Sequence, residues 1–431
     1  MFENIYCIPT HREMDEKYLR DYFMEVDFAN KKLNVTCPLV IFEDNKVNVN
    51  QKKLFEIKRE FEEVPVYYIT RERIVKIYDF IKENLSNHSE KIFMKLYPNN
   101  NINYGNVFNR IFIVALLFGA DCIHRRDSDV LIDTDIHGEK VYPIVNEMKH
   151  LSKIIDNKIV YIVGGGYKGK YDLDVDSLID GDDYTLLREL FTCMSIPTEH
   201  HDDIIHDEIL ENNKIFEQDN ISFDSRDYPE CGNIALYNLH RYFPSPTQDF
   251  ILGSDYFFID MSIHTKLNVT YHNRAVIHSY TSERKNDLDK VFRYWKGFMM
   301  LIDSQIYYRN FYEKYLDSQD YNDLSFGKHI NEIIYDMKRF LEEFTENYNE
   351  CRKEKYLKCI YVLSLSKDEV LKDVATKLKS EAVLQKILDM TIESVRDHIE
   401  LIDTWSEIVN VCDRTKDSLT IQKILKEAYI K

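Results

Sequence analysis

The last quarter of the chain contains neither glycine nor proline. The 431-residue sequence has twelve glycines and nine prolines, and the last of each are Gly327 and Pro246, so the final 104 residues (431 − 327) lack both. Because these two residues interrupt helices and mark turns, their absence predicts a region built almost entirely of helices. Apolar residues recur at the spacing of an amphipathic helix over 330–344 and again over 384–395. We therefore expect residues 286–431 to form an all-α region whose apolar stripes face its own core.

The composition is that of a packed globular protein. Hydrophobic residues make up 44% of the chain and aromatic residues 13%, which is too apolar and too aromatic for a disordered protein. The formal net charge is 56 − 74 = −18. This acidic excess argues against nucleic acid as a partner, because neutralising phosphates requires a surplus of lysine and arginine. At this length a single core becomes inefficient, so two domains, or one large domain with an appendage, are expected.

Cysteine usage and the first residues indicate the compartment. The eight cysteines are scattered and form no C-x-x-C pair, which favours buried thiols in a reducing environment. The opening MFENIYCIPTHRE lacks the basic and apolar regions of a signal peptide. No stretch approaches the roughly 18 uninterrupted apolar residues of a membrane span. We expect a cytoplasmic protein without a membrane anchor.

The first 280 residues alternate short apolar runs with helical patterns. Strands joined by helices in this way predict an α/β fold with a doubly wound, mainly parallel, Rossmann-like sheet. Such sheets bind ligands beyond the carboxyl ends of their strands, so functional residues are expected directly after each run. The runs are 4–9, 38–44, 64–70, 120–127 and 158–165.

The densest motif occupies residues 104–133. Its pattern predicts a helix that ends at Gly119, followed by a strand that leads into Asp127, Ser128 and Asp129. Carboxylates at the end of a strand, two positions apart, point toward the same region beyond the sheet edge. Hard oxygen ligands so placed suit Mg²⁺ or Mn²⁺, which can bridge the phosphates of a nucleotide. Other Asp-x-Asp copies in the chain lack this context and are interpreted as solvated loop residues.

This order of helix, glycine, strand and Asp-x-Asp resembles the nucleotide-sugar domain of GT-A-fold glycosyltransferases, especially the family-2-like members. The resemblance covers about residues 1–285, and the segment from about 165 to 230 contains no landmark of the family. The residues that match its pattern in order are Asn109, Arg110, Ala115, Gly119, Asp127 and Asp129.

The resemblance implies where the nucleotide binds. The first strand ends in Pro9, Thr10 and, two positions later, Arg12, similar to the family's turn that touches the base and ribose. Glu43 and Asp44 follow the second strand, where the family carries an acidic residue close to the uracil. The resemblance also places Asn109 and Arg110 among the residues expected to contact the donor.

The resemblance also implies catalytic and metal-binding residues. The stretch 252–256 looks like the family's Gly-Glu-Asp-Tyr segment, in which the aspartate, here Asp255, is the catalytic base. Ser254 stands where the family has an acidic residue. A residue at the end of a later strand, here His278, supplies the third metal ligand beside Asp127 and Asp129, and neutral imidazole suits Mn²⁺.

Several residues near the predicted metal ligands are further candidates to contact the donor. Arg126 and Ser128 lie within or beside the Asp-x-Asp segment, and Arg284 follows His278. Arg125 and Lys285 are further candidates, although the arginines at 125 and 126 have a second interpretation as partners of acidic residues on the sheet.

The expected function is a Mn²⁺- or Mg²⁺-dependent glycosyltransferase of the hexosyltransferase type. A UDP-sugar is the favoured donor, and Asp255 as base implies inversion at the anomeric carbon. The acceptor is open between a peptide, a protein and a cell-surface glycan. Two alternatives remain: a sugar-phosphate nucleotidyltransferase, and a non-catalytic scaffold with a degenerate transferase domain.

The expected domains are a catalytic domain over 1–285, with an acceptor-side half from about 150, and a helical region over 286–431. This region is a candidate for acceptor binding, for homodimer formation, or for capping the sheet. A glycine-rich stretch at 164–169 satisfies G-x-G-x-x-G, but the acidic residues after it favour a loop that lines the donor or acceptor pocket. The histidine-rich segment 199–206 is interpreted as a surface loop rather than a metal site.

Overall fold

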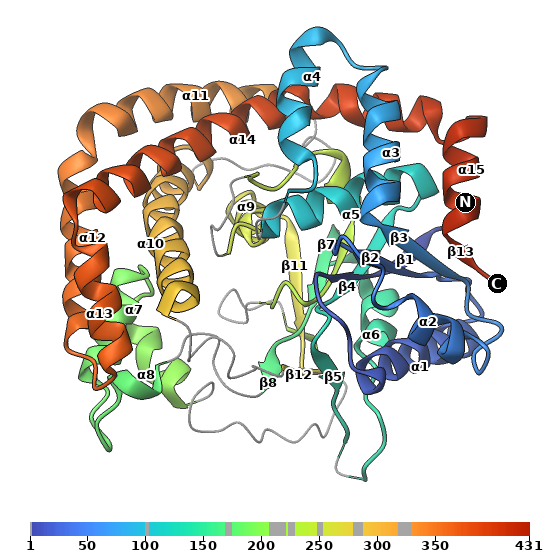
Figure 1. Cartoon of the computed structure of the whole chain (residues 1–431), viewed down its shortest axis with the longest axis horizontal. Coiled ribbons are helices and arrows are strands. Elements are labelled where there is room, and N and C mark those ends of the chain that lie inside the picture. The colour runs from blue at the N-terminus through green and yellow to red at the C-terminus, as the bar shows by residue number, and fades with distance from the viewer. Residues whose placement is uncertain are drawn as a thin grey trace.

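A large mixed sheet forms the centre of the molecule (Figure 1). The computed structural model describes residues 2–99, 103–135, 137–168, 175–206, 221–222, 229–247, 253–278, 288–317 and 329–431. In sheet order the strands are β13 (Tyr429–Ile430), β3 (Val66–Thr70), β2 (Leu39–Glu43), β1 (Asn4–Thr10), β4 (Cys122–Arg126), β10 (Asn233–Tyr237), β7 (Lys158–Gly164), β11 (Asn268–His272) and β9 (Ile221–Ser222), with β6 (Ile154–Ile155) paired to β7. The pairs β3–β2, β2–β1, β1–β4 and β7–β11 are parallel, whereas β10 runs antiparallel to both of its neighbours.

Apolar cores cover both faces of the sheet, so its central strands are buried on both sides. In β1, Ile5 and Cys7 pack into one apolar core, and Tyr6 and Ile8 pack into another on the opposite face. A strand with two buried faces reads as a continuous apolar run rather than an alternating one. The five strands predicted in the first 165 residues are confirmed, as is the doubly wound, mainly parallel arrangement.

The fold contains fifteen α-helices in its described part. They are α1 (Glu16–Leu33), α2 (Gln51–Lys58), α3 (Arg71–Lys82), α4 (Asn87–Phe93), α5 (Tyr104–Phe118), α6 (Pro143–His150), α7 (Thr185–Cys193), α8 (His201–Ile204), α9 (Phe257–His264), α10 (Leu288–Phe311), α11 (Ile330–Asn347), α12 (Asn349–Ser364), α13 (Glu369–Leu378), α14 (Glu381–Thr415) and α15 (Leu419–Ala428). As predicted, α5 ends at Gly119, which adopts the left-handed conformation that glycine tolerates best (φ 66°).

A second, three-stranded sheet lies beside the first. Its order is β5 (Val130–Ile132), β12 (Val276–His278) and β8 (Tyr167–Lys168). The strand β5 is antiparallel to β12, and β12 is parallel to β8. This small sheet joins three segments that are far apart in the sequence, and each segment carries a residue of the site described below.

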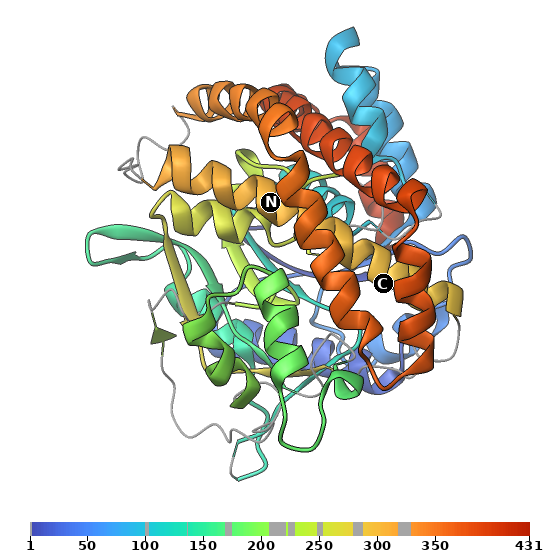
Figure 2. The ribbon, with the colours of Figure 1, turned by 90° about the vertical axis from the view of Figure 1, so that its left-hand side faces the viewer.

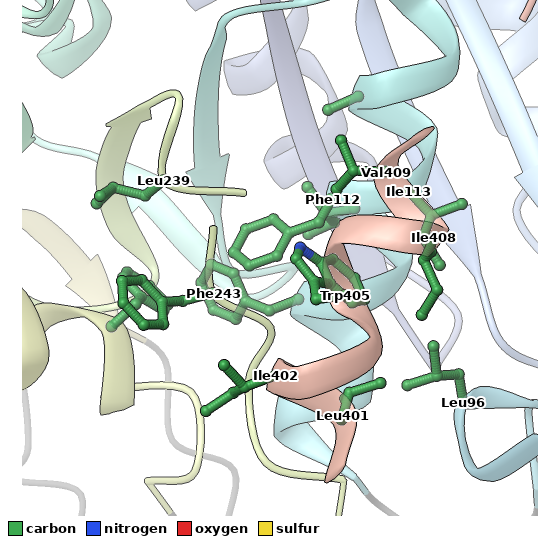
Figure 3. Close-up of a cluster of buried hydrophobic side chains, with 14 of the residues drawn as sticks. Leu96, Phe112, Ile113, Leu239, Phe243, Leu401, Ile402, Trp405, Ile408 and Val409 are labelled. Atoms are coloured by element: carbon green, nitrogen blue, oxygen red, sulfur yellow. The ribbon is translucent and has the colours of Figure 1, made fainter. Parts of the chain in front are cut away.

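The predicted C-terminal helical region is confirmed, except that residues 429–430 form the strand β13, and the region packs on the sheet as well as around a core of its own. Trp405 of α14 is fully buried among residues of α5 and of the segment 239–243, in the same apolar core as one face of the sheet (Figure 3). Its indole Nε1 donates a hydrogen bond to the carbonyl of His240 (2.9 Å). Figures 1 and 2 show α14 running across the upper part of the molecule, where it contacts α3, α4 and α5.

The far end of the helical region has its own core. Residues of α7, α10, α12, α13 and the start of α14 surround the buried Trp295.

The last strand of the chain, β13, pairs antiparallel with β3 and extends the edge of the large sheet. The helical region therefore contacts both the sheet edge and one sheet face. Within the described residues, none of the helices is both long and apolar enough to cross a membrane.

Candidate active site

The candidate site lies where the order of the parallel strands reverses. The chain builds β1, β2 and β3 outward in one direction and then returns to place β4 on the other side of β1. At such a switch point the connections after the two strands diverge and leave a crevice, which is where open α/β sheets bind ligands. Thr10 ends β1, and Asp127 directly follows β4.

Asp127 is held by three groups. Its Oδ1 accepts a hydrogen bond from Nη2 of Arg125 (2.7 Å), and its Oδ2 accepts one from the hydroxyl of Tyr167 (2.5 Å). The hydroxyl of Tyr22 lies 2.7 Å from its backbone carbonyl. Burial opposes ionisation of this carboxyl group, yet Arg125 and His278 bring the pKa of Asp127 below its ordinary value. The carboxyl group of Asp127 is therefore ionised, and each of its two oxygens accepts a hydrogen bond.

Gly232 makes room for this arrangement. A Cβ atom at this position would lie 2.0 Å from the hydroxyl of Tyr167 and 2.2 Å from Oδ2 of Asp127. These separations are far below any real contact distance, so a side chain at 232 excludes the Tyr167–Asp127 hydrogen bond. Burial raises the pKa of Tyr167 well above its ordinary value, which keeps its hydroxyl a donor.

Asp129 and His278 meet because β5 pairs with β12. His278 is the register partner of Val130, the residue that follows Asp129. As a result His278 Nε2 lies 3.6 Å from Asp129 Oδ1. The other oxygen of Asp129 accepts a hydrogen bond from Nη2 of Arg12 (2.9 Å). Both Asp129 and His278 are buried.

Asp129 and His278 lie close enough together to be candidate ligands of one divalent ion. Two donor atoms that each lie about 2.1 Å from an octahedral ion are about 3.0 Å apart when adjacent, so the observed separation of 3.6 Å would have to shorten by about 0.6 Å for both to bind it. Among the described residues no three His, Cys, Asp or Glu side chains form a complete metal site. Asp127, the third predicted ligand, is instead bound to Arg125 and Tyr167. A two-residue set suits Mg²⁺ or Mn²⁺, because such ions commonly use one or two carboxylates and complete their shell with substrate phosphates.

Asp255, the predicted base, lies at the same site. Its Oδ2 is 4.0 Å from Nη2 of Arg125, the same nitrogen that binds Asp127. The Cys231 thiol donates a hydrogen bond to the Asp255 carbonyl (3.3 Å), and the Ser254 hydroxyl accepts one from the amide of Gly105 (3.1 Å). These contacts fix the turn before α9, so the buried carboxylate of Asp255 is held close to the Asp-x-Asp segment.

Four further residues of the site did not emerge from the sequence. Tyr167 and Gly232 are described above, and Tyr256 donates a hydrogen bond to Glu230 beside Asp255. For Tyr167 a signal existed, because it directly follows the glycines that end β7 at the sheet edge. Tyr167 of the predicted glycine-rich loop thus contacts Asp127. Gly232 and Glu230 lie in no recognisable motif, whereas Tyr256 occupies the tyrosine position of the 252–256 segment.

Of the residues predicted to contact the nucleotide, Pro9, Thr10, Glu43 and Asp44 lie at the ends of β1 and β2. Thr10 pairs in register with Glu43, and the carbonyl of Thr10 accepts a hydrogen bond from the amide of Asp44 (2.8 Å). Pro9 lies one position earlier in β1. Asp44 Oδ2 is 2.8 Å from Nη1 of Arg110, and its buried Oδ1 has no hydrogen-bond partner among the described residues.

Glu43 is enclosed rather than open to a ligand. Its carboxylate accepts hydrogen bonds from Asn45 (2.5 Å), Asn50 (2.5 Å) and the hydroxyl of Tyr68 (3.2 Å). Burial raises the pKa of Glu43. Asn109 is likewise occupied, because its amide group exchanges two hydrogen bonds with the backbone of Ser245 (2.8 and 2.9 Å).

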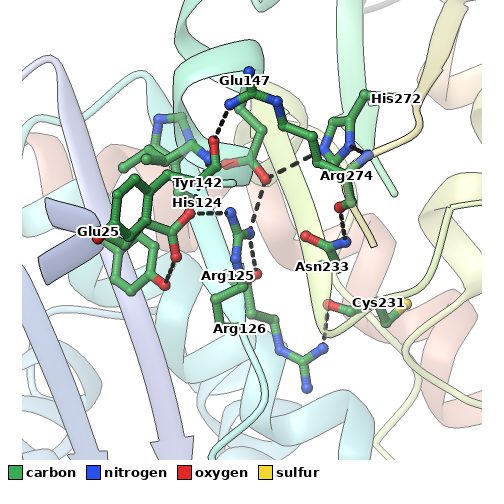
Figure 4. Close-up of polar contacts among 12 residues, drawn as sticks. Glu25, His124, Arg125, Arg126, Tyr142, Glu147, Cys231, Asn233, His272 and Arg274 are labelled. Carbon is green, nitrogen blue, oxygen red and sulfur yellow. Dashed lines mark hydrogen bonds and ion pairs between the residues drawn. The ribbon is translucent and has the colours of Figure 1, made fainter. Parts of the chain in front are cut away.

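Arg126 points away from the other predicted residues. Successive side chains of a strand face opposite sides, so Arg125 faces Asp127 while Arg126 lies in a buried network on the other face of the sheet (Figure 4). There its guanidinium contacts Glu25 and Glu147 (2.8 Å each), and all three side chains are fully buried. Ser128 is buried between the two aspartates. Arg284 and Lys285 lie outside the described residues.

Comparison with known proteins identifies a family and a few structural similarities. The family model described as "Family of unknown function (DUF6271)" matches residues 5–420. No curated protein sequence matches the chain.

Three solved structures are similar at a TM-score of 0.36. One is titled a mycobacterial protein, with 9% identity over 69% of this chain and 73% of that chain. A second is mannosyl-3-phosphoglycerate synthase from Rubrobacter xylanophilus, with 8% identity over 72% of this chain and 75% of that chain. The third is the mannosyltransferase PcManGT from Pyrobaculum calidifontis in complex with GDP-Man and Mn²⁺, with 10% identity over 97% of this chain and 88% of that chain.

Proposed function

The chain belongs to the family of unknown function DUF6271, and we propose that it is a metal-dependent glycosyltransferase that uses a nucleotide sugar as donor. One observation carries this proposal: Asp127, Asp129, His278 and Asp255, four residues from three distant segments, converge at the switch point of a doubly wound sheet. A UDP-sugar is the favoured donor. The free Oδ1 of Asp44, beside the end of β1, is an acceptor of the kind that the N3–H of uracil requires.

The charges of the site support a diphosphate ligand once a cation is bound. Asp127, Asp129 and Asp255 carry three negative charges, and Arg12 and Arg125 carry two positive ones, so these five side chains sum to −1. A divalent ion would change this sum to +1. The overall acidity of the chain is therefore compatible with an anionic substrate, provided that the substrate and the ion bind together.

In the proposed mechanism the residues divide into two groups. Asp129 and His278 would hold Mn²⁺ or Mg²⁺, which supplies Lewis-acid stabilisation of the charge that develops on the departing diphosphate. Asp255 removes the proton from the attacking group of the acceptor, which implies inversion at the anomeric carbon. Arg125 lies between Asp127 and Asp255 and holds both carboxylates in fixed relative positions.

The substitution Asp129→Ala tests the metal-binding half of the site. Purified protein is incubated with UDP-, GDP- and dTDP-sugars and Mn²⁺, and release of the nucleoside diphosphate is measured. We expect wild-type protein to hydrolyse one of these donors slowly and Asp129→Ala to reduce the rate by about 100-fold or more, because the leaving group loses its stabilisation.

Asp133→Ala provides the matched control. Asp133 is four positions away and pairs with Lys168 (2.5 Å) rather than with His278. This variant should retain most of the activity, and circular dichroism should show a folded protein for both variants. Equal rates for the wild-type protein and Asp129→Ala would refute the proposed metal site.

A further inference from the structure

Each carboxylate of the Asp-x-Asp segment already has an arginine partner. Arg125 Nη2 lies 2.7 Å from Asp127 Oδ1, and Arg12 Nη2 lies 2.9 Å from Asp129 Oδ2. A guanidinium at this distance satisfies part of the negative charge that a metal ion would otherwise neutralise. A divalent ion that binds to Asp129 must therefore displace Arg12 or share the carboxylate with it.

Arg125 is held firmly in place. Its side chain is only 5% exposed. Its guanidinium lies 4.5 Å from the centre of the Phe108 ring, and Nη1 donates a hydrogen bond to the carbonyl of Cys231. Moving this side chain would break a cation–π contact and leave a buried charge without its partners, which is costly.

Arg12 differs because only its backbone is fixed. Its amide donates a hydrogen bond to the hydroxyl oxygen of Thr10 (3.2 Å), and its carbonyl accepts one from Asn50 (2.9 Å). The side chain of Arg12 is 36% exposed, whereas that of Asp129 is 12% exposed, so Arg12 is the partner that can reach solvent. The guanidinium can therefore leave Asp129 by rotation of the side chain alone, while the turn after β1 keeps its shape.

We propose that Arg12 is a movable counter-cation, which pairs with Asp129 in the metal-free protein and turns to the donor diphosphate when a divalent ion takes its place. This inference rests on the proposed function and specifies how the site is regulated. The ion alone then binds weakly, because it competes with Arg12. The ion and the diphosphate bind cooperatively, because the diphosphate provides the released guanidinium with a new partner, and this coupling is reciprocal.

Calorimetric titration with MnCl₂ alone tests the proposal without catalytic turnover. We compare the wild-type protein with Arg12→Gln, which removes the charge, and with Arg12→Lys, which keeps it. Arg20→Gln is the matched control, because Arg20 of α1 is also 36% exposed and ion-paired, with Glu16 of the same helix and with Glu60 after α2. We expect Arg12→Gln to bind Mn²⁺ about three- to tenfold more tightly than wild type, and the other two variants to resemble wild type.

A second titration measures the coupling. Mn²⁺ affinity is determined with and without saturating UDP, or GDP if only GDP binds. Added nucleotide should strengthen Mn²⁺ binding more in the wild-type protein than in Arg12→Gln. Unchanged or weaker binding of Mn²⁺ by Arg12→Gln would overturn the role of Arg12, even if nucleotide binding depends on the metal. Failure of either nucleotide to bind in the presence of Mn²⁺ would instead overturn the proposed function, which the titration with Mn²⁺ alone does not presuppose.

Discussion

Arg125 lies between two carboxylates of the candidate site, Asp127 and the proposed base Asp255. One of its nitrogens lies 2.7 Å from Asp127 and 4.0 Å from Asp255. Burial by itself lowers the pKa of Arg125, but the negative charges of Asp127 and Asp255 outweigh it and raise that pKa, so Arg125 is a permanent cation. Because its position is fixed by Phe108 and Cys231, it sets the separation between the Asp-x-Asp segment and the predicted base. Precise separation of this kind matters in catalysis, since small displacements of reacting groups are costly.

The role of Asp255 is tested by Asp255→Asn, which keeps the shape of the side chain and removes its basicity. We expect donor binding, measured by titration with nucleotide and Mn²⁺, to change by less than about threefold. Transfer should fall by about 100-fold or more, because general-base catalysis typically contributes that much. Loss of donor binding with transfer intact would show that Asp255 contacts the donor and is not the base.

The strand period explains which of the two adjacent arginines belongs to the site. Residues 125 and 127 are two positions apart and share a face, whereas Arg126 faces the opposite side. The sequence prediction placed Arg126 among the donor-binding residues, and the alternation of side chains was the available signal against it. The Asp-x-Asp segment, Asp255 and His278 were predicted from motif order, and the structure brings them together.

The three-stranded sheet explains the parts of the site that local sequence patterns do not reveal. Val130 and His278 are 148 positions apart (278 − 130) and become register partners only through the β5–β12 pair. Tyr167 joins them through the pairing of β8 with β12. Short strands of two or three residues have no periodicity, so their pairing is not predictable from one sequence, unlike the long buried strands of the main sheet.

At the level of helices, α14 should stabilise the sheet, because Trp405 fills the core between α14 and α5. We expect Trp405→Ala to lower the free energy of unfolding by about 3–5 kcal/mol, as truncation of a buried aromatic residue usually does. Trp295 is then the only tryptophan left, and its fluorescence can follow urea unfolding in the second core.

The control for this experiment is Leu419→Ala, at a side chain that is 91% exposed at the start of α15. This variant should unfold within about 0.5 kcal/mol of wild type. A loss of less than about 1 kcal/mol in Trp405→Ala would contradict a shared core between the helical region and the sheet.

For the molecule as a whole, buried neutral histidines make stability depend on pH. His398 of α14 donates from Nε2 to the carbonyl of Pro244 (2.9 Å) and accepts at Nδ1 from the hydroxyl of Tyr308 (2.7 Å), an arrangement that requires the neutral ring. Burial lowers the pKa of His398 to about 4 and that of His240 to about 3. In the unfolded chain both groups take up protons near pH 6.5.

The sign of the effect follows from proton uptake. Between pH 6.5 and 4 the unfolded chain binds more protons than the folded chain, so stability is fully present above about pH 6.5 and falls as the pH is lowered. Over this pH interval His398 contributes about 3 kcal/mol to the loss of unfolding free energy. Urea unfolding of wild type and His398→Gln at pH 7.5 and pH 4.5 measures it: the wild-type protein should lose more stability than the variant. An equal loss in both would show that His398 is not the group responsible.

The net charge of −18 and an anionic donor are reconciled only if a cation binds with the donor. Titration of the wild-type protein with UDP and with GDP, each with and without Mn²⁺, therefore tests the central claim most directly. We predict that one nucleotide binds at least about tenfold more tightly with Mn²⁺ than without it, and that Asp129→Ala abolishes this difference. Binding that is equally tight without the metal, or no binding of either nucleotide with it, would contradict a metal-dependent nucleotide-sugar site at Asp129 and His278.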